Sequence, residues 1–437
     1  MRSARTRNLG IVVVGLGLAV AILSAGRAIG AQARQAAPAS QTGSQAWPAW
    51  RGPLGTGEAP AAKPPTEWSE TKNIKWKVGL PGQGKSSPIV WRDTLYVTTA
   101  VPGEGGVVRF TLMALNRADG TEKWSRVLRQ EKPHEGHHPD GTYAGGSALT
   151  DGRRLYAWFG SRGLYAVDFT GQVVWEKSFG QMQTRNGFGE GSSVAIHDGT
   201  LVVPWDHEGA DFVIALDAAT GKEKWRTPRD EPTTWATPLI IAPGGARQVV
   251  LSGTNRVVGY DLATGTQLWQ AGGTTMNAIP SPVFADGVLI AMGGFRGSMA
   301  RAIRLADAKG DVTGTPAQAW TYEKDTPYVP SPLLYRGAVY FLKVNSGILT
   351  SLDAKTGAVR FSERLAAVPN VYASPVAADG RIYVVGREGT TAVLDAGPAP
   401  KVLATNVLDE ATDTTPALVD GEIYLRGAKS LYRISAN

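Results

Sequence analysis

One eleven-residue phrase recurs at wide intervals and limits what this chain can fold into. It reads ALDAATGKEKW at residues 215–225, GYDLATGTQLW at 259–269 and ALNRADGTEKW at 114–124, while SLDAKTGAVRF at 351–361 carries Phe361 instead of the tryptophan. In most copies an apolar run ends at Asp–x–x–Thr–Gly, which is typical of a turn, and a second run follows. The phrase therefore predicts a β-hairpin repeated along the chain, with its last aromatic residue packed between adjacent repeats.

A second phrase marks the start of each repeat. A serine or threonine, often followed by proline, opens an apolar run, and successive copies lie 41 to 60 residues apart. Between them the sequence divides into four short runs separated by turn residues, as in a propeller blade. The 437 residues, 43% of them hydrophobic, can supply a large core. We predict an all-β fold, an eight-bladed β-propeller of four-stranded antiparallel blades, whose innermost strands follow Ser87, Ser147, Ser193, Thr237, Ser281, Ser331, Ser374 and Thr415.

The last repeat is one strand short. Three runs follow Thr415, whereas residues 73–80, NIKWKVGL, place Trp76 in a fourth-strand position near the beginning of the sequence. An N-terminal strand that closes the last blade would remove an open sheet edge. We therefore assign residues 72–437 to the propeller and residues 32–71 to a Pro/Gly-rich N-terminal arm that is expected to wrap the outside.

Residues 1–31 have the layout of a signal peptide, because three arginines precede an apolar run at 11–23 and small residues follow it. An uncleaved anchor is the alternative interpretation. The signal-peptide layout predicts a periplasmic or secreted protein without a stable transmembrane span after cleavage, since the apolar run is too short to span a membrane. The chain has no cysteine, so we expect neither disulfides nor a lipid anchor. The net charge of +7 falls to +3 without residues 1–31, and no basic run follows, which argues against a nucleic-acid partner.

The loops at the two faces of a propeller carry its functional residues. On one face, here called the short-turn face, the turns are mostly minimal, such as HDGT at 197–200. The opposite face, here called the long-loop face, carries the two-to-three and four-to-one connections, including an insertion at 129–146. Solvated loops are one interpretation of its polar residues, and a ligand-binding surface at the channel mouth is the other. The candidates for that surface are Arg185, Asn186, Glu190, Asp206, His207, Glu208, Trp235, Asn255, Asn277, Arg296 and Tyr328.

Three groups on the long-loop face suggest chemistry. An acidic pocket for a cation, or an acid–base pair, could be formed by Glu190, Asp206, His207 and Glu208. Zinc ligands or a solvated loop would each explain the spacing of His134, His137, His138 and Asp140. A stacking platform for a sugar, a quinone or a peptide could be formed by Trp235, Phe295 and Tyr328 beside Arg296, Asn255 and Asn277. The sequence contains no recognisable nucleophile–base–orienter set and no phosphate-binding loop, so catalytic and metal-binding residues stay unassigned.

The recurring A-x-D-x-x-T-G-x-x-x-W phrase resembles the pyrroloquinoline-quinone (PQQ) type repeat. With WPAWRGPLGTG at 47–57, the chain resembles secreted bacterial eight-bladed propellers of that family over residues 47–437. The family includes periplasmic quinoprotein dehydrogenases and the BamB-type subunit of the outer-membrane protein assembly machinery. The dehydrogenases commonly hold the quinone against a disulfide of adjacent cysteines, with calcium, an aspartate base and a tryptophan floor. BamB-type proteins are usually lipoproteins, and this chain lacks the cysteine that either feature requires.

The resemblance implies two classes of function, because a propeller of this type hosts both. The leading expectation is an exported, non-catalytic scaffold or binding propeller of the cell envelope, without a cofactor, whose partner is an envelope protein, a small molecule or a saccharide. The alternative is a PQQ-dependent periplasmic oxidoreductase for alcohols or sugars, with PQQ and calcium as its cofactors. Polysaccharide recognition or hydrolysis is a third hypothesis.

Overall fold

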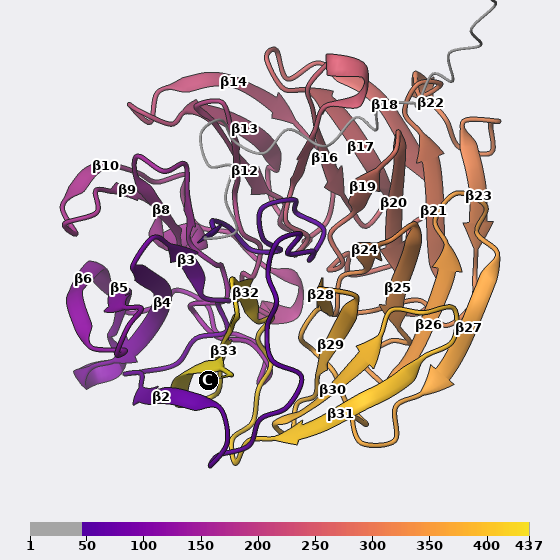
Figure 1. The fold of residues 1–437 in the computed structure, drawn as a ribbon. Coiled ribbons are helices and arrows are strands. Elements are labelled where there is room, and N and C mark those ends of the chain that lie inside the picture. Colours follow the sequence, from indigo (N-terminus) through magenta and orange to yellow (C-terminus); the bar gives the residue numbers. More distant parts are fainter. Residues whose placement is uncertain (1–45, 437) are drawn as a thin grey trace, which may run out of the picture. The chain divides into compact units, whose positions relative to one another are not determined.

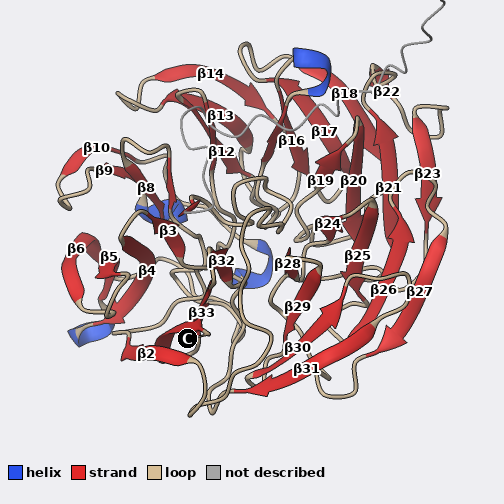
Figure 2. Ribbon diagram, viewed as in Figure 1, coloured by secondary structure: helices blue, strands red, loops and turns tan. Residues whose placement is uncertain are grey.

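Eight β-sheets follow one another around a central axis in the computed structural model, which describes residues 46–436 (Figures 1 and 2). Each sheet contains four antiparallel strands that run in order from the axis to the outer rim, and two sheets gain a fifth strand. The predicted eight-bladed propeller is therefore confirmed. No helix within these residues is long and apolar enough to cross a membrane.

The strands of the first four blades are β3 (Ile89–Trp91), β4 (Thr94–Pro102), β5 (Val108–Asn116) and β6 (Glu122–Glu131); β7 (Leu149–Thr150), β8 (Leu155–Trp158), β9 (Leu164–Val167) and β10 (Val173–Lys177); β11 (Ala195–His197), β12 (Thr200–Trp205), β13 (Phe212–Asp217) and β14 (Glu223–Pro228); β15 (Leu239–Ile241), β16 (Gln248–Ser252), β17 (Arg256–Asp261) and β18 (Gln267–Gly272). Short 3-10 helices lie in the connections, at Glu104–Gly106, Gly160–Arg162, Arg185–Gly187 and Pro243–Gly245. The extra strands are β1 (Ala46–Trp47), beside β3, and β22 (Gly310–Asp311), parallel to β18.

The strands of the last four blades are β19 (Val283–Ala285), β20 (Val288–Gly293), β21 (Met299–Arg304) and β23 (Gln318–Tyr322); β24 (Leu333–Tyr335), β25 (Ala338–Leu342), β26 (Ile348–Asp353) and β27 (Val359–Arg364); β28 (Val376–Ala378), β29 (Arg381–Val385), β30 (Thr390–Asp395) and β31 (Lys401–Val407); β32 (Ala417–Val419), β33 (Glu422–Arg426), β34 (Ser430–Ser435) and β2 (Ile74–Gly79). β2 pairs antiparallel with β34, with Trp76 beside Arg433. The predicted closure of the last blade by an N-terminal strand is therefore confirmed.

The repeated phrase forms the turn between the third and fourth strands of a blade, and a tryptophan of the preceding blade packs on this turn. In blade 3, Oδ1 of Asp217 accepts hydrogen bonds from the backbone N–H (2.9 Å) and the hydroxyl (2.7 Å) of Thr220, and Gly221 takes a φ of +69°. Trp175 of the preceding blade lies over Gly221 and donates from Nε1 to the Ala218 carbonyl at 3.1 Å. The corresponding tryptophans dock on the next blade in the same way, and they are Trp76, Trp124, Trp225 and Trp320.

Trp269 is an exception to this packing. Its Nε1 donates to Gln248 in its own blade at 2.9 Å, because blade 5 has the long 307–318 connection where blades 1, 3, 4 and 6 have the repeated turn. Part of that connection, β22, covers the outer edge of β18 instead. Because the repeated turn is replaced in blade 5, the contact between blades 4 and 5 differs from the other contacts of this kind.

A ring of hydrogen bonds joins the innermost strands around the axis. The residues of the second phrase take part, because the backbone N–H of each one from Ser87 to Ser374 donates to the side-chain oxygen of the next, as from Ser147 to Ser193 at 3.0 Å. Seven such bonds link Ser87, Ser147, Ser193, Thr237, Ser281, Ser331, Ser374 and Thr415 in this order, each between 2.8 and 3.0 Å. The Ser/Thr positions that define the sequence period therefore also fix the spacing of the blades.

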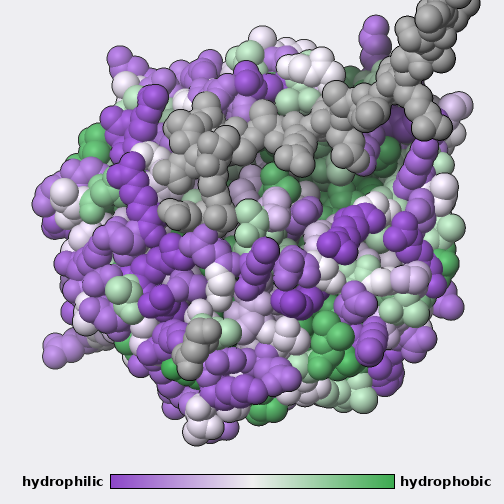
Figure 3. Space-filling view, in the orientation of Figure 1, coloured by the Kyte–Doolittle hydropathy of each residue, from purple (hydrophilic) through white to green (hydrophobic). Residues whose placement is uncertain are grey.

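The described part of the N-terminal arm, residues 46–71, mostly crosses the channel instead of wrapping the outside, and only its end, at Trp68 and Ser69, lies against the outer strand β31. The rest of the arm and the predicted signal peptide lie outside the described residues. Figure 1 shows the first described residues crossing the central region before they reach β2. Trp47 is fully buried, and the buried Arg51 donates to the carbonyl oxygens of Pro375 (2.9 Å), Thr56 (2.6 Å) and Pro332. The physical reason is that a channel lined by eight innermost strands leaves backbone carbonyls and apolar surface to be covered, and the arm covers them. The face drawn in Figure 3 is largely hydrophilic, with small hydrophobic areas between.

Candidate functional site

A pocket of about 500 Å³ lies at the channel mouth on the long-loop face. Its lining comes from the four-to-one connections of successive blades, from the 129–146 insertion and from the arm residue Trp50. The Ser and Thr side chains of the axial ring of hydrogen bonds, here called the hydroxyl ring, form part of the wall. Aromatic side chains form much of the rest: Trp50, Phe188, Trp235, Phe295, Tyr328 and Tyr372. The volume falls within the range of roughly 300–1,000 Å³ that is usual for small-molecule sites.

The predicted aromatic platform is part of this pocket. Phe295 and Tyr328 stack with their ring centroids 4.7 Å apart and their planes at 23°. Trp235 is held by its backbone N–H, which donates to Ala278 (2.8 Å), and by Nε1, which donates to Gly189 (2.7 Å). These contacts give the pocket two fixed aromatic walls from different blades.

Two further predicted residues lie near this platform. Asn277 is 3% exposed, and its side chain donates to the Tyr328 hydroxyl and accepts from Arg185, both at 3.4 Å. Arg296 lies outside the pocket lining, with its guanidinium 5.4 Å from the centroid of the Phe295 ring. Of the polar residues predicted for the platform, Asn277 thus orients Tyr328, whereas Arg296 lies outside the pocket.

Sequence reasoning missed a charged cluster on the opposite side of the pocket. Lys85 pairs with Asp413 at 2.5 Å, and Arg387 pairs with Asp413 at 2.8 Å and with Asp140 at 2.6 Å. The Tyr372 hydroxyl donates to Asp140 at 2.9 Å, and burial, followed by this carboxylate, raises the pKa of Tyr372 to about 12. The cluster joins the 129–146 insertion to the last two blades, and all its charges are paired.

Glu190 lines the pocket, but Ser161 and Arg162 of the preceding blade bind its carboxylate. Its carboxylate accepts hydrogen bonds from the backbone N–H and the hydroxyl of Ser161, both at 2.6 Å, and from Arg162 at 2.9 Å. Burial raises the pKa of Glu190, against the opposing effect of Arg162. The carboxylate therefore locks two blades together.

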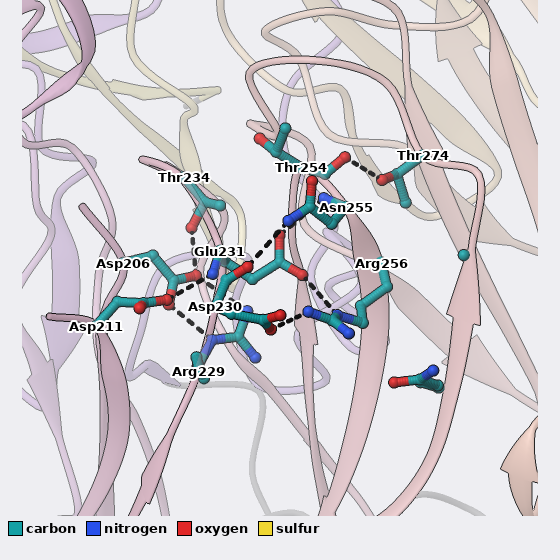
Figure 4. Close-up of polar contacts among 12 residues, drawn as sticks. Asp206, Asp211, Arg229, Asp230, Glu231, Thr234, Thr254, Asn255, Arg256 and Thr274 are labelled. Atoms are coloured by element: carbon teal, nitrogen blue, oxygen red, sulfur yellow. Dashed lines mark hydrogen bonds and ion pairs between the residues drawn. The ribbon is translucent and has the colours of Figure 1, made fainter. Parts of the chain in front are cut away.

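Asp206 and Glu190 both line a small cavity of about 10 Å³, but Asp206, His207 and Glu208 each bond to different partners. Within residues 46–436 they do not form a cation-binding group of three or more acidic or histidine side chains. Asp206 is buried, and its two oxygens pair with Arg229 at 2.7 and 3.0 Å (Figure 4). The imidazole Nδ1 of His207 accepts two backbone N–H bonds at 3.1 and 3.2 Å. Glu208 accepts from Thr233 at 2.8 and 3.1 Å. Adjacent residues of one loop point in different directions, which separates the three groups.

Asn255 belongs to the buried network around Glu231, not to the pocket. Its backbone N–H donates to Glu231 at 2.7 Å, and Arg256 Nε donates to the other oxygen at 3.1 Å (Figure 4). Burial raises the pKa of Glu231 to about 7. Asn186 is exposed at the start of the 185–191 loop, with a φ of +55°.

The histidines of the insertion have separate roles. His134 bonds to the Met182 carbonyl at 2.8 Å, His137 packs edge-on against Tyr143, and His138 packs edge-on against Phe188. Within residues 46–436, no group of three or more histidine, aspartate or glutamate side chains is arranged to hold a metal ion. The insertion closes the wall of the pocket through these contacts.

Comparison with known proteins adds the family. The sequence model of the family described as "Outer membrane protein assembly factor BamB" matches residues 66–190, 170–314 and 213–437. This chain belongs to that PQQ-repeat family. A curated relative, the outer membrane protein assembly factor BamB of Yersinia pestis, is 26% identical over 221 residues, which are 45% of this chain and 52% of the relative. The chain thus matches about half of the length of that relative.

Solved structures with the same fold include a BamB protein and a quinohemoprotein dehydrogenase. BamB from Moraxella catarrhalis aligns with a TM-score of 0.56 and 15% identity, over 83% of this chain and 99% of that chain. Quinohemoprotein alcohol dehydrogenase from Comamonas testosteroni aligns with a TM-score of 0.64 and 12% identity, over 90% of this chain and 80% of that chain. At these identities the likeness concerns the fold alone.

Proposed function

We propose that the protein is an exported, non-catalytic scaffold of the cell envelope that takes part in outer-membrane protein assembly. Its docking surface is the long-loop face, where it binds a component of the assembly machinery. The observation that carries this proposal is an exposed apolar rim beside the pocket, formed by Met276, Phe295 and Val344 with the neighbouring Arg296. The match to the BamB family supports the choice of partner.

The apolar rim is held rigidly toward solvent. Met276 is 41% exposed and Val344 is 40% exposed, and each lies in a backbone bridge, to Phe295 and to Pro327 respectively. Val344 has a φ of +52°, and Arg296 has a φ of +53°. A β-branched residue in the left-handed region costs of order 1–3 kcal/mol, and such strain clusters at functional sites. An apolar side chain kept in water at this cost, as that of Val344 is, suits a protein-binding surface.

The state of the polar groups also supports a scaffold. Glu190, Asp206 and His207 are each committed to two or more internal contacts, whereas a general acid or base needs a lone pair or proton directed at the substrate. These contacts lock loops and blades instead.

The dehydrogenase alternative is favoured by one observation, the axial pocket in a fold shared with a quinohemoprotein enzyme. The residues present do not fit PQQ, which carries several carboxylates. The cations on the pocket side, Lys85, Arg387 and Arg162, are already paired with Asp413, Asp140 and Glu190. Burying a multiply charged anion without an unpaired cation is costly.

Site-specific photo-crosslinking tests the proposal. A photoreactive residue at position 276 or 344 should form a crosslink, in living cells, with a component of the outer-membrane protein assembly machinery. Position 359, where Val359 on the outer strand β27 is 54% exposed, is the matched control and should give no such product. Equal products from all three positions, or none from the rim, would contradict the proposal.

A further inference from the structure

We propose that the pocket at the channel mouth binds one ring of a neutral saccharide. This ligand site adjoins the apolar rim and shares Phe295 with it, but it opens into the channel and does not depend on the proposed function. Three features of the pocket carry the inference, namely its hydroxyl ring, its aromatic walls and its balanced charges.

The hydroxyl ring offers unused donors. Ser147 and Ser193, for example, each use the side-chain oxygen to accept a backbone N–H from the preceding blade. A hydroxyl that accepts still has one proton to donate. In the described part of the chain, no protein acceptor takes that proton from any of the ring hydroxyls, and seven of the eight ring residues line the pocket. The pocket therefore presents several donors to a ligand rich in oxygen acceptors.

The aromatic walls suit a ligand with apolar faces. Tyr328, stacked on Phe295, and Trp235 belong to different blades and line the same pocket, and Trp50 from the arm adds a further ring. A pyranose ring presents C–H groups on its faces and hydroxyls around its edge. Its faces would pack on these rings while its edge accepts hydrogen bonds from the hydroxyl ring.

The charges of the pocket favour a neutral ligand. Its three carboxylates, Asp140, Asp413 and Glu190, are each paired with arginine or lysine at 2.5 to 2.9 Å. Among the described residues no unpaired arginine or lysine lines the pocket, since the exposed Arg296 lies outside the lining, so an anion would enter without a partner, and a cation would have to displace an existing one. A neutral polyol needs neither change.

Calorimetric titration of the purified protein with glucose, N-acetylglucosamine, maltose and cellobiose tests the inference, with citrate as the anionic comparator. At least one neutral saccharide should bind, and citrate should not. Tyr328→Ala removes one wall and should weaken binding at least tenfold. Ile279→Trp, at a half-buried lining position, should do the same by filling the pocket without removing a wall. Val359→Ala on the outer rim should bind as the unchanged protein does.

The outcomes separate this site from the docking surface. Binding lost in both pocket variants, with melting temperatures unchanged and crosslinking from position 276 preserved, supports a saccharide pocket. If no neutral saccharide binds, if citrate binds in preference, or if both pocket variants bind normally, the inference is overturned. Loss of crosslinking alone would bear on the proposed function and not on this site.

Discussion

The contact between each outer-strand tryptophan and the next blade predicts a specific cost for Gly265→Ala. Gly265 has a φ of +73°, and a Cβ built on it would lie 2.5 Å from the Trp225 ring. The left-handed conformation costs an alanine about 1–2 kcal/mol. The ring cannot stay in place, and overpacking of this kind costs about 1–3 kcal/mol more. Since the Trp225 Nε1 also donates to Leu262 at 2.9 Å, displacement of the ring endangers a buried hydrogen bond.

Gly287→Ala is the matched control. Gly287 has a φ of +78° in another turn of the short-turn face, and a Cβ there would meet no atom within 4 Å. This variant should therefore carry the backbone cost alone. Thermal unfolding followed by circular dichroism should place the Gly265→Ala midpoint clearly below that of Gly287→Ala, by the equivalent of about 1–3 kcal/mol.

A double-variant cycle completes the test. In a Trp225→Leu background the ring is absent, so the cost of Gly265→Ala should fall toward that of Gly287→Ala, with only the Thr227 hydroxyl, 2.9 Å from the added Cβ, still to be displaced. Equal destabilisation by the two glycine variants in the unchanged chain would refute the idea that tryptophan docking joins the blades. So would a Gly265→Ala cost that stays the same without the ring.

Three further predictions concern closure, the hydroxyl ring and pH. Deleting residues 47–80 removes β2 and the part of the arm from residue 47 onward, so it should unfold or oligomerise the protein, and a monomer with an unchanged melting temperature would refute the closure. Ser193→Ala leaves the Ser147 N–H without an acceptor and should cost about 1–3 kcal/mol in chemical unfolding, whereas equal stability of Ser193→Ala and Ser193→Thr would count against the ring. Because burial raises the pKa of Glu231 from 4.5 to about 7, the folded state keeps a proton that the unfolded state releases, and stability falls as pH rises through this window. Glu231→Gln should therefore reduce the loss of melting temperature between pH 5 and pH 8, and an undiminished loss would contradict this assignment.

The fold could be predicted from the sequence because the residues that recur in each repeat also make the contacts that define a blade. The Ser/Thr positions form the axial ring, and the Asp, Thr and Gly of the repeated phrase form the turn on which a tryptophan docks. Closure could be predicted as well, since Trp76 repeats the same docking contact on Gly120 across the seam.

The site was predictable only in part. The aromatic members Trp235 and Tyr328 were found because they fall at loop positions of the long-loop face. The direction of a side chain within one loop is set by its partners, as Arg229 draws Asp206 into the core. The cluster of Lys85 and Asp413 joins residues more than 300 positions apart. Its signal was the position of each residue two places before a ring residue, Ser87 and Thr415.

The amount of assembled outer-membrane β-barrel protein in cells tests the proposed function most directly. The native gene would be replaced by one carrying Met276→Asp and Val344→Asp, and the control strain would carry Val359→Asp on the outer rim. The protein carrying Met276→Asp and Val344→Asp should accumulate normally, but the level of assembled β-barrel proteins should fall. The control strain with Val359→Asp should keep the normal level. Normal assembly in the rim variant, or an equal defect in both strains, would contradict the account.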